Sequence, residues 1–297
     1  MKRESFNDKI FIVLNYIVLT IVTLTTLYPL LFVLIASISD PLLVNSGQVW
    51  FWPKGITFEG YYRVFQSGNI ILGYKNTMMY TFLGTLISLF ITFTCSYPLS
   101  VKELPYKKTL FMIFAFTMFF SGGIIPTFLL VKNINIYNTI WAMILPGSVS
   151  VMNIIISRTY IESSIPTTVT EAAVIDGCNE YSVFFKMILP LSKPILTVLA
   201  LFYGIQYWNA FFNALIYLSN EKLFPLQVFL REILIQTQLD SQMIMSGSNL
   251  EAFDQQSKIA ESVKFGVIVV STLPLLIVFP FLQKFFEKGV MLGAVKG

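Results

Sequence analysis

Five polar side chains recur at helical spacing in an apolar stretch near residue 210, and their types suit the binding of a sugar. They are Tyr203, Gln206, Asn209, Asn213 and Tyr217. Amides pair with hydroxyls, and the neighbouring aromatic rings can stack on the apolar face of a pyranose. Because residues three and four apart share a helix face, all five would lie on roughly one face. The pattern is equally typical of hydrogen bonds between membrane helices, worth about 0.6 to 2 kcal/mol each.

Residue types that catalyse reactions or bind metals are scarce. The chain contains no histidine, the commonest metal ligand and general base. Its charged residues avoid the long apolar runs, so no carboxylate is placed for chemistry inside them. The sequence therefore predicts that the chain is not an enzyme, with no catalytic residue, no metal site and no cofactor of its own.

The composition places the chain in a lipid bilayer. Hydrophobic residues make up 55% of the 297 residues and charged residues only 12%, which is too apolar for an ordinary water-soluble domain. A helix needs about 20 apolar residues to cross about 30 Å of hydrocarbon, and the runs lack the alternation of a membrane barrel. No Asp, Glu, Lys or Arg occurs in 10–39, 76–101, 109–131, 133–157, 194–220 or 265–283.

We therefore expect an all-α, polytopic membrane protein with six transmembrane helices. The expected spans are about 10–38, 76–99, 109–131, 138–157, 194–218 and 263–284. Tyr28 and Pro29 should bend or end the regular part of the first span. Residues 121–126 should interrupt the third, either beside a lined pathway or through close packing of small residues. The chain 1–297 would form one transmembrane domain with a core at about 74–284. The aromatic-rich outer segment 40–74 would be a structured cap or an interfacial belt, and the polar, mixed outer segment 219–262 would contain loop or short helix at Met243–Gly247 and Asp254–Ser257.

The basic residues assign the orientation. With six spans both termini lie on one side, and twelve of the twenty Lys and Arg residues fall on that side in the shorter connections, which makes it cytoplasmic. The net charge of +4 then reflects topology and gives no reason to expect nucleic acid as a partner. Cys95 and Cys178 would lie near or beyond the cytoplasmic face, where thiols stay reduced, so no disulfide is expected.

The long cytoplasmic connection 158–193 predicts two short helices joined by a tight corner. Thr168 followed by Glu171 has the spacing of a capping box and should begin the first helix. Gly177 can adopt the positive φ that a helix C-terminus often needs, and Asn179 can cap the next helix. The second helix should present an apolar face of Phe184, Met187 and Ile188 to the membrane or to neighbouring helices.

Small side chains on the first of these helices suggest a docking surface, since Ala172 and Ala173 would let the backbone of another protein approach closely. At this point the sequence resembles the membrane subunits of ABC importers. The cytoplasmic EAA loop of that family matches Glu171, Ala172, Ala173, Gly177, Leu189 and Pro190, with a conservative departure at Met187.

Further matches resemble the carbohydrate-uptake type of these permeases along nearly the whole chain. They are Ile175–Gly177, Leu189–Pro194, Trp208–Asn209 and the tail Lys288–Gly289 with Gly293–Gly297. Phe120–Pro126 and Glu261–Lys264 resemble a subgroup that handles complex oligosaccharides in Gram-positive bacteria.

The resemblance implies a permease subunit that translocates an oligosaccharide across the bacterial cytoplasmic membrane, with both termini cytoplasmic. The implied partners are a second homologous permease, two cytoplasmic ATPases that bind ATP and Mg, and an extracytoplasmic solute-binding protein that is usually a lipoprotein. In such importers the loop couples ATP binding to opening of the pathway, and the tail 288–297 would reach toward the ATPase interface or be a disordered end.

Two alternatives remain open. The chain could serve an ABC importer for another solute, or it could be an ion-coupled secondary transporter. Symporters commonly place ionisable side chains inside the membrane, and none lies in the cores of these spans, which weighs against the second alternative.

Overall fold

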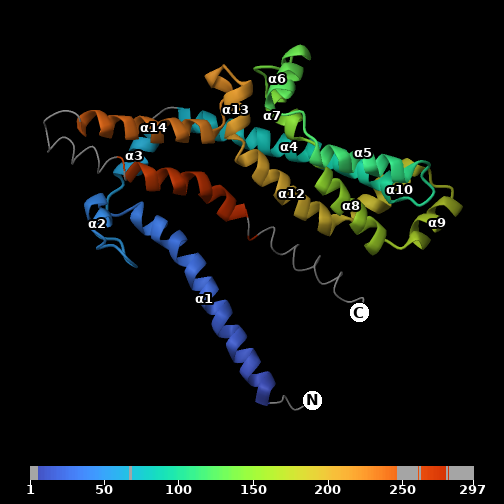
Figure 1. The fold of residues 1–297 in the computed structure, drawn as a ribbon, viewed down its shortest axis with the longest axis horizontal. Helices are drawn as coiled ribbons and strands as arrows, with labels where there is room; N and C mark the ends of the chain where they lie inside the picture. The colour runs from blue at the N-terminus through green and yellow to red at the C-terminus, as the bar shows by residue number, and fades with distance from the viewer. Residues whose placement is uncertain (1–5, 67–68, 246–259, 261, 279, 281–297) are drawn as a thin grey trace. The chain divides into compact units, whose positions relative to one another are not determined.

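The computed structural model describes residues 6–66, 69–245, 260, 262–278 and 280. Every regular element in these residues is helical and none is a strand, which confirms the expected all-α fold (Figure 1). The described residues belong to two compact units. The first comprises those of Met1–Gly68 and Leu230–Leu273, and the second those of Asn69–Phe229 and Pro274–Gly297.

The first unit contains α1 (Phe6–Ala36), α2 (Pro41–Asn45), α3 (Glu59–Gln66), and most of α14 (Leu226–Met245) and of the helix Ser262–Val278. A missing side chain lets two of these helices touch, because a Cβ atom at Gly60 would lie 2.3 Å from the carbonyl oxygen of Ser262. Phe32 and Phe265 meet edge to face, with 6.1 Å between ring centroids. These contacts build a small core that also includes Ala36 and Val44.

Helix α1 continues through Pro29 to Ala36, so it does not end at Tyr28 and Pro29, one of the two expected outcomes there. Proline removes one backbone N–H and usually breaks a helix in water. Membrane helices tolerate it, because the surroundings can satisfy the freed backbone group locally. The apolar side chains of α1 are exposed over most of its length, as expected for a helix that meets lipid or another membrane subunit.

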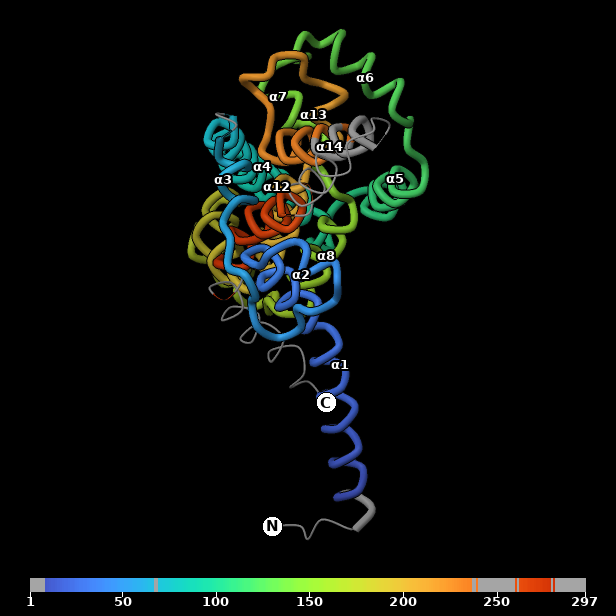
Figure 2. Tube along the Cα trace, turned by 90° about the vertical axis from the view of Figure 1, so that its left-hand side faces the viewer, coloured from blue at the N-terminus to red at the C-terminus, as the bar shows by residue number. Residues whose placement is uncertain are grey.

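The second unit is built around the long helix α4 (Asn69–Ser100). Its other helices, in chain order, are α5 (Lys107–Phe119), α6 (Ile124–Asn133), α7 (Ile140–Ile144), α8 (Val151–Ser164), α9 (Thr167–Ile175), α10 (Glu180–Val183), α11 (Leu189–Leu191), α12 (Lys193–Trp208) and α13 (Phe211–Tyr217). Short 3-10 turns at Leu145–Gly147 and Glu221–Leu223 and a π-helix at Phe184–Ile188 connect some of them. Helix α4 lies beside α12 and also contacts α8 (Figure 1 and Figure 2).

Small and hydroxyl-bearing residues let α4 and α12 approach closely. The ring of Tyr207 lies against Gly84, where a Cβ atom would come within 2.6 Å of it. The Tyr207 hydroxyl donates to the carbonyl oxygen of Ile144 at 2.9 Å and lies 3.0 Å from the Ser88 hydroxyl. One turn away, the hydroxyls of Thr92 and Tyr203 lie 2.7 Å apart. Such contacts are typical of helix packing in membranes, where small residues and interhelical hydrogen bonds replace the hydrophobic effect.

The apolar helices of the described residues match the expected spans only in part. Two helices, Lys9–Ala36 and Asn69–Ser100, are long and apolar enough to cross a membrane alone. Three further candidates are pairs of helices bent by more than 40° at a short break, which would bring the number to five, and Ser262–Val278 is shorter. The third expected span is broken between Phe119 and Ile124 with a bend of 111°, which confirms the predicted interruption.

One other sequence-based boundary is wrong. The expected continuous span 194–218 is divided, since α12 ends at Trp208 and α13 begins at Phe211. The outer segment 219–262 contains the 20-residue helix α14, which was not predicted, and Met243–Met245, part of a stretch expected to be loop or short helix, forms its end. Polar groups of α4 fix the start of α14: Thr77 Oγ1 accepts from the backbone N–H of Leu226 at 2.8 Å, and Asn76 donates to two carbonyl oxygens just before it.

The first prediction tests the close contact of α4 and α12 with two glycines. Gly84→Ala should lower the thermal stability of the purified protein, because overpacking against the fixed Tyr207 ring costs about 1–3 kcal/mol. Gly204→Ala is the matched control, since its Cβ atom would meet its nearest neighbour at 3.9 Å. The control should be neutral or stabilising by up to about 1 kcal/mol through helix propensity. Equal melting temperatures for the two variants would contradict this packing.

Candidate coupling loop and substrate path

The first loop helix, α9, begins differently from the sequence-based expectation. Pro166 is its N-cap residue, with φ −63° and ψ 136°, and no side chain caps the helix. The predicted capping box of Thr168 and Glu171 is therefore wrong, because Thr168 already lies inside the helix. Proline provides the reason: it forces the preceding residue, Ile165, into an extended conformation and so fixes where a new helix can start.

Gly177 ends α9 as predicted, with φ +80°. Its N–H donates to the carbonyl of Val174 at 3.0 Å, and the N–H of Cys178 donates to the carbonyl of Ala173 at 2.9 Å. These two bonds form a Schellman motif, which satisfies carbonyl groups that the helix end leaves free. Since nothing lies within 4 Å of a Cβ atom built at Gly177, the glycine is required by its backbone conformation and not by lack of space.

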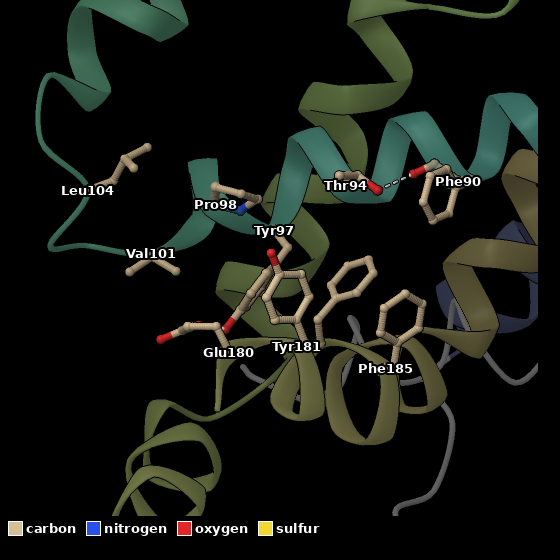
Figure 3. Close-up of a pocket in the computed structure, with 10 residues that line it drawn as sticks. Phe90, Thr94, Tyr97, Pro98, Val101, Leu104, Glu180, Tyr181 and Phe185 are labelled. Atoms are coloured by element: carbon tan, nitrogen blue, oxygen red, sulfur yellow. Dashed lines mark hydrogen bonds between the residues drawn. The ribbon is translucent and has the colours of Figure 1, made fainter. Parts of the chain in front are cut away.

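The second loop helix is capped and packed as predicted. The side chain of Asn179 accepts from the backbone N–H of Ser182 at 2.8 Å, which confirms it as the N-cap. Phe184 and Ile188 are buried against the neighbouring helices. Tyr97 near the end of α4 adds a polar contact, because its hydroxyl donates to the Glu180 carboxylate at 2.9 Å. The second loop helix is thus held to the rest of the unit by the apolar packing of Phe184 and Ile188, and to α4 by the hydrogen bond from Tyr97 to Glu180 (Figure 3).

The two alanines of the loop face opposite ways. Ala173 is only 1% exposed and packs inside this chain's own cluster, so it is unable to form the docking surface expected of it. Ala172 and Glu171 are exposed on the outer face of α9. Ile175 is 85% exposed beside them, which leaves an apolar side chain uncovered at the tip of the loop. At the other end of the loop, Leu189 is half-buried and Pro190 exposed.

Ion pairs join the start of α5 to α8. The Glu162 carboxylate lies 2.9 Å from both Lys107 Nζ and Arg158 Nη2. The guanidinium of Arg158 also lies over the ring of Phe111, 4.8 Å from its centroid. Partly exposed ion pairs contribute modestly, at about 0–1 kcal/mol each, but this network joins the helix before the loop to a neighbouring helix.

The expected substrate-path residues divide into two groups. Tyr203 and Tyr217 are buried: the first bonds Thr92, and the second stacks with Phe128 at 6.5 Å between centroids. Gln206 and Asn209 are exposed at the end of α12, and Asn213 lies half-buried on α13 beyond the break. The five therefore do not form one continuous helical stripe.

The exposed amides are partly engaged by the protein itself. Gln206 Nε2 donates to the carbonyl oxygen of Gly147 at 2.9 Å, and Asn209 Nδ2 donates to that of Ile205 at 3.0 Å. Both accepting carbonyls lie at helix breaks or ends; that of Ile205 also accepts the backbone N–H of Asn209 at 3.1 Å. The amide oxygens remain available to a hydroxyl donor, since no described residue donates to them.

Sequence reasoning missed a second polar row, on α4. The hydroxyls of Thr81 and Thr85 are buried and have no hydrogen-bond partner among the described residues. Both threonines lie about 4 Å from the position of a Cβ atom at Gly204, on the face that α4 turns to α12. The signal was present in the spacing of hydroxyl residues at 77, 81, 85, 88 and 92, which repeats every three or four residues.

Known proteins resemble this chain along most of its length. Residues 69–292 match the family described as binding-protein-dependent transport system inner membrane components. The chain belongs to this family. It is therefore a membrane subunit of a transporter and not a catalytic enzyme, and the resemblance to ABC importer permeases is confirmed.

Individual relatives cover nearly the whole chain. Protein LplC of Bacillus subtilis (strain 168) is 36% identical over 97% of this chain and 96% of its own length. The polygalacturonan/rhamnogalacturonan transport system permease protein YtcP of the same organism is 36% identical over 98% and 99%. A chain in the crystal structure of a bacterial ABC transporter involved in the import of the acidic polysaccharide alginate matches with a TM-score of 0.81 and 32% identity, covering 96% of this chain and 100% of that one.

Some expectations concern residues that lie outside the described part of the chain. The tail 288–297 and Glu261 are among them, so the tail's approach to an ATPase remains a prediction. Within the described residues, no group of three or more His, Cys, Asp and Glu side chains is placed to hold a metal ion.

The second prediction concerns the corner at Gly177. Gly177→Val should loosen the loop, because a β-branched residue at positive φ costs about 1–3 kcal/mol. Gly177→Asn should cost less, since asparagine tolerates this conformation better than other residues. Limited proteolysis of the purified protein should show faster cleavage near residue 177 in the order Val, Asn, wild type. If Asn and Val behave alike, positive φ is not what the corner requires.

Proposed function

We propose that the chain is a membrane-spanning permease subunit of an ABC importer, and that it translocates an oligosaccharide into a bacterial cell. The observation that carries the proposal is the loop corner, where an exposed face with Glu171 and Ala172 ends at a Schellman motif while Ala173 anchors the loop inside. Such a corner can receive force from a partner and pass it on without bending. Family membership and the names of the relatives support the same conclusion.

A continuous buried cluster would carry the motion from the loop to the pathway. It contains Ala173 of α9, Phe184 and Ile188 of the second loop helix, and Leu199, Tyr203 and Tyr207 of α12. Packed interiors deform little, so a push on α9 should move α12 as a rigid body. Two partner ATPases would bind ATP and Mg and supply the push, and α12 carries Gln206 and Asn209 at its far end.

The oligosaccharide is proposed from chemistry and from relatives together. Exposed amides at Gln206 and Asn209 lie among aromatic rings such as Phe211 and Phe212, a mixture that suits hydroxyls and pyranose faces. Relatives named for arabinooligosaccharides and for melibiose, raffinose and stachyose support a saccharide substrate. A second homologous permease and a solute-binding lipoprotein would complete the importer.

The third prediction is that the outer face of α9 transmits force. Ala172→Arg should abolish association with the ATPase or its stimulation by loaded binding protein, because a long charged side chain would separate the docked surfaces. Ser163→Arg, on an exposed site at the end of α8, is the matched control and should couple normally. The measurement is ATPase activity and uptake of the purified complex in liposomes. Normal coupling in Ala172→Arg would contradict the role of this face. Uptake that is abolished by ionophores and does not depend on ATP would contradict the ABC mechanism.

The fourth prediction separates path residues from packing residues. Gln206→Ala and Asn209→Ala should reduce uptake about tenfold, the effect of losing about 1.4 kcal/mol of binding to a passing hydroxyl, while assembly stays intact. Tyr203→Phe should preserve uptake and instead lower thermal stability by about 1 kcal/mol, through loss of the bond to Thr92. Uptake and melting temperature are measured on the same preparations. Normal uptake in both amide variants would make the amides structural.

The fifth prediction tests six spans with both termini in the cytoplasm, a topology that the basic residues support. Tags at Met1 and Gly297 should report the cytoplasm. In a chain lacking Cys95 and Cys178, a cysteine at the exposed Lys54 should react with an impermeant reagent from outside, and one at the exposed Ser163 should not. An external terminus would remove the six-span topology.

A further inference from the structure

The bare surface of α1 marks how much of this helix can lie in hydrocarbon. From Lys9 to Leu27 every residue of α1 is exposed, and Tyr28 is the first that is partly covered. At 1.5 Å per residue the stretch 9–27 is about 28 Å long, close to the ~30 Å of hydrocarbon in a bilayer. Tyr28 therefore lies at the level where hydrocarbon gives way to headgroups, and Lys9 lies at the opposite level.

The segment that follows α2 turns back along α1 to this level. The rings of Phe51 and Tyr28 lie 5.5 Å apart between centroids. Helix α1 continues from Tyr28 to Ala36, about 12 Å farther along its axis. A segment that starts beyond Ala36 and reaches Tyr28 must therefore run back beside the helix, toward the part that lies in the membrane (Figure 1).

Hydrogen bonds hold this segment in its turned-back form. The backbone N–H of Asp40 donates to the carbonyl oxygen of Lys54 at 2.9 Å, and that of Thr57 donates to the carbonyl oxygen of Ile38 at 3.0 Å. Both ends of the segment are thus fixed just beyond the C-terminal end of α1. The part between them, which contains Trp50–Trp52, extends back along the helix.

The tip of the segment, defined as Trp50–Trp52, exposes three aromatic side chains. Trp50, Phe51 and Trp52 are 63%, 65% and 79% exposed. The indole N–H of Trp50 donates to the carbonyl oxygen of Gly47 at 2.6 Å, whereas that of Trp52 has no partner within the described residues. Such a ring suits the membrane interface, because it can contact acyl chains and donate to a lipid oxygen at the same time.

The charges near the tip give no preference between anionic and zwitterionic lipids. Lys54 is exposed and takes part in no ion pair within the described residues, while the carboxylate of Asp40 caps α2. Glu59 and Arg63 pair with each other at 2.8 Å. One basic and one acidic group remain beside a neutral pair, so contact of the aromatic rings, and not charge, would carry binding to a lipid surface.

A soluble partner fits the tip less well than lipid does. A solute-binding protein would approach beyond the C-terminal end of α1, whereas the tip turns away from that end. The exposed side chains of Ile56 and Phe58 lie near it instead, because Thr57 between them bonds Ile38. These two residues are better placed for a protein that arrives from water.

We propose that the tip Trp50–Trp52 inserts among the headgroups and upper acyl chains of the phospholipids at this end of α1. In the proposed orientation these lipids belong to the outer leaflet. Lys9 and the tip then anchor the two ends of the bare stretch of α1 and fix its depth in the bilayer, since basic and aromatic side chains at the interfaces set the position of a membrane helix.

The accessibility of a spin label separates lipid, water and protein around the tip. The complete transporter, made without cysteines, receives a single one by Trp52→Cys or Phe58→Cys, is spin-labelled there and is reconstituted in phosphatidylcholine vesicles. Phe58 is the matched control, because it is also exposed in this segment and lies beyond Ala36. That is ~12 Å past the level of Tyr28, beyond the ~6 Å of the headgroup region.

The label of Trp52→Cys should collide often with oxygen, which partitions into lipid, and rarely with a water-soluble nickel complex, and the label of Phe58→Cys should show the reverse. Frequent collisions of the first label with nickel would place the tip in water. Few collisions with either reagent would mean that the second permease or another protein covers it. Each of these two outcomes would overturn the proposal.

A second readout keeps the native side chains. The tryptophan fluorescence that is lost in Trp52→Phe should be quenched more by lipids brominated near the headgroup than by lipids brominated near the chain ends. Quenching that is absent, or that is stronger from the chain ends, would contradict insertion at the interface. Because both readouts report depth and not uptake, the result does not depend on the transported solute.

Discussion

The hydroxyl of Tyr207 holds three helices together, and the arrangement of the second unit depends on it. Because the hydroxyl donates its single proton to Ile144, the Ser88 hydroxyl must donate to Tyr207. The carbonyl of Ile144 lies where α7 gives way to a 3-10 turn, so the bond ties α12 to the backbone at this break. In a bilayer an unsatisfied carbonyl costs several kcal/mol, and a broken helix persists only where protein supplies the missing partner.

The same residue lies at one end of the buried cluster whose other end is the loop. From Tyr207 the packing continues through Tyr203 and Leu199 of α12 to Ile188, and from there to Ala173 on α9. Ala173 is therefore small for an internal reason: a larger side chain would push α9 away from the helices it packs against. Ala172 is exposed, so the packing of this chain does not require it to be small. One alanine of the pair serves the fold, and the other remains on the surface.

Sequence reasoning predicted the features that depend on local chemistry. The apolar runs predicted the helical class, Gly177 predicted the corner after the first loop helix, and Asn179 predicted the cap of the second. Each of these features is decided by residues close together in the sequence. Sequence reasoning failed where a helix boundary or a side-chain direction depends on residues far apart in the sequence. The start of the long helix α14 is held by contacts from α4, such as Thr77 to Leu226, that are far away in sequence. The direction that Ala173 faces was equally invisible, since both alanines fit the same helical pattern until the packing partner is known.

The break at the end of α12 also bears on which solute could pass. Gln206 and Asn209 each use one of two amide N–H groups on a backbone carbonyl, so each leaves one N–H and its carbonyl oxygen for a solute. A hydroxyl, which both donates and accepts, can use both of these groups, whereas a carboxylate, which only accepts, can use only the N–H. Among the described residues, α12 and α13 carry no basic side chain beyond Lys193 at the opposite end of α12. A saccharide with acidic groups would therefore need its charge met by other parts of the importer, whereas the hydroxyls of any saccharide can be met by these two amides.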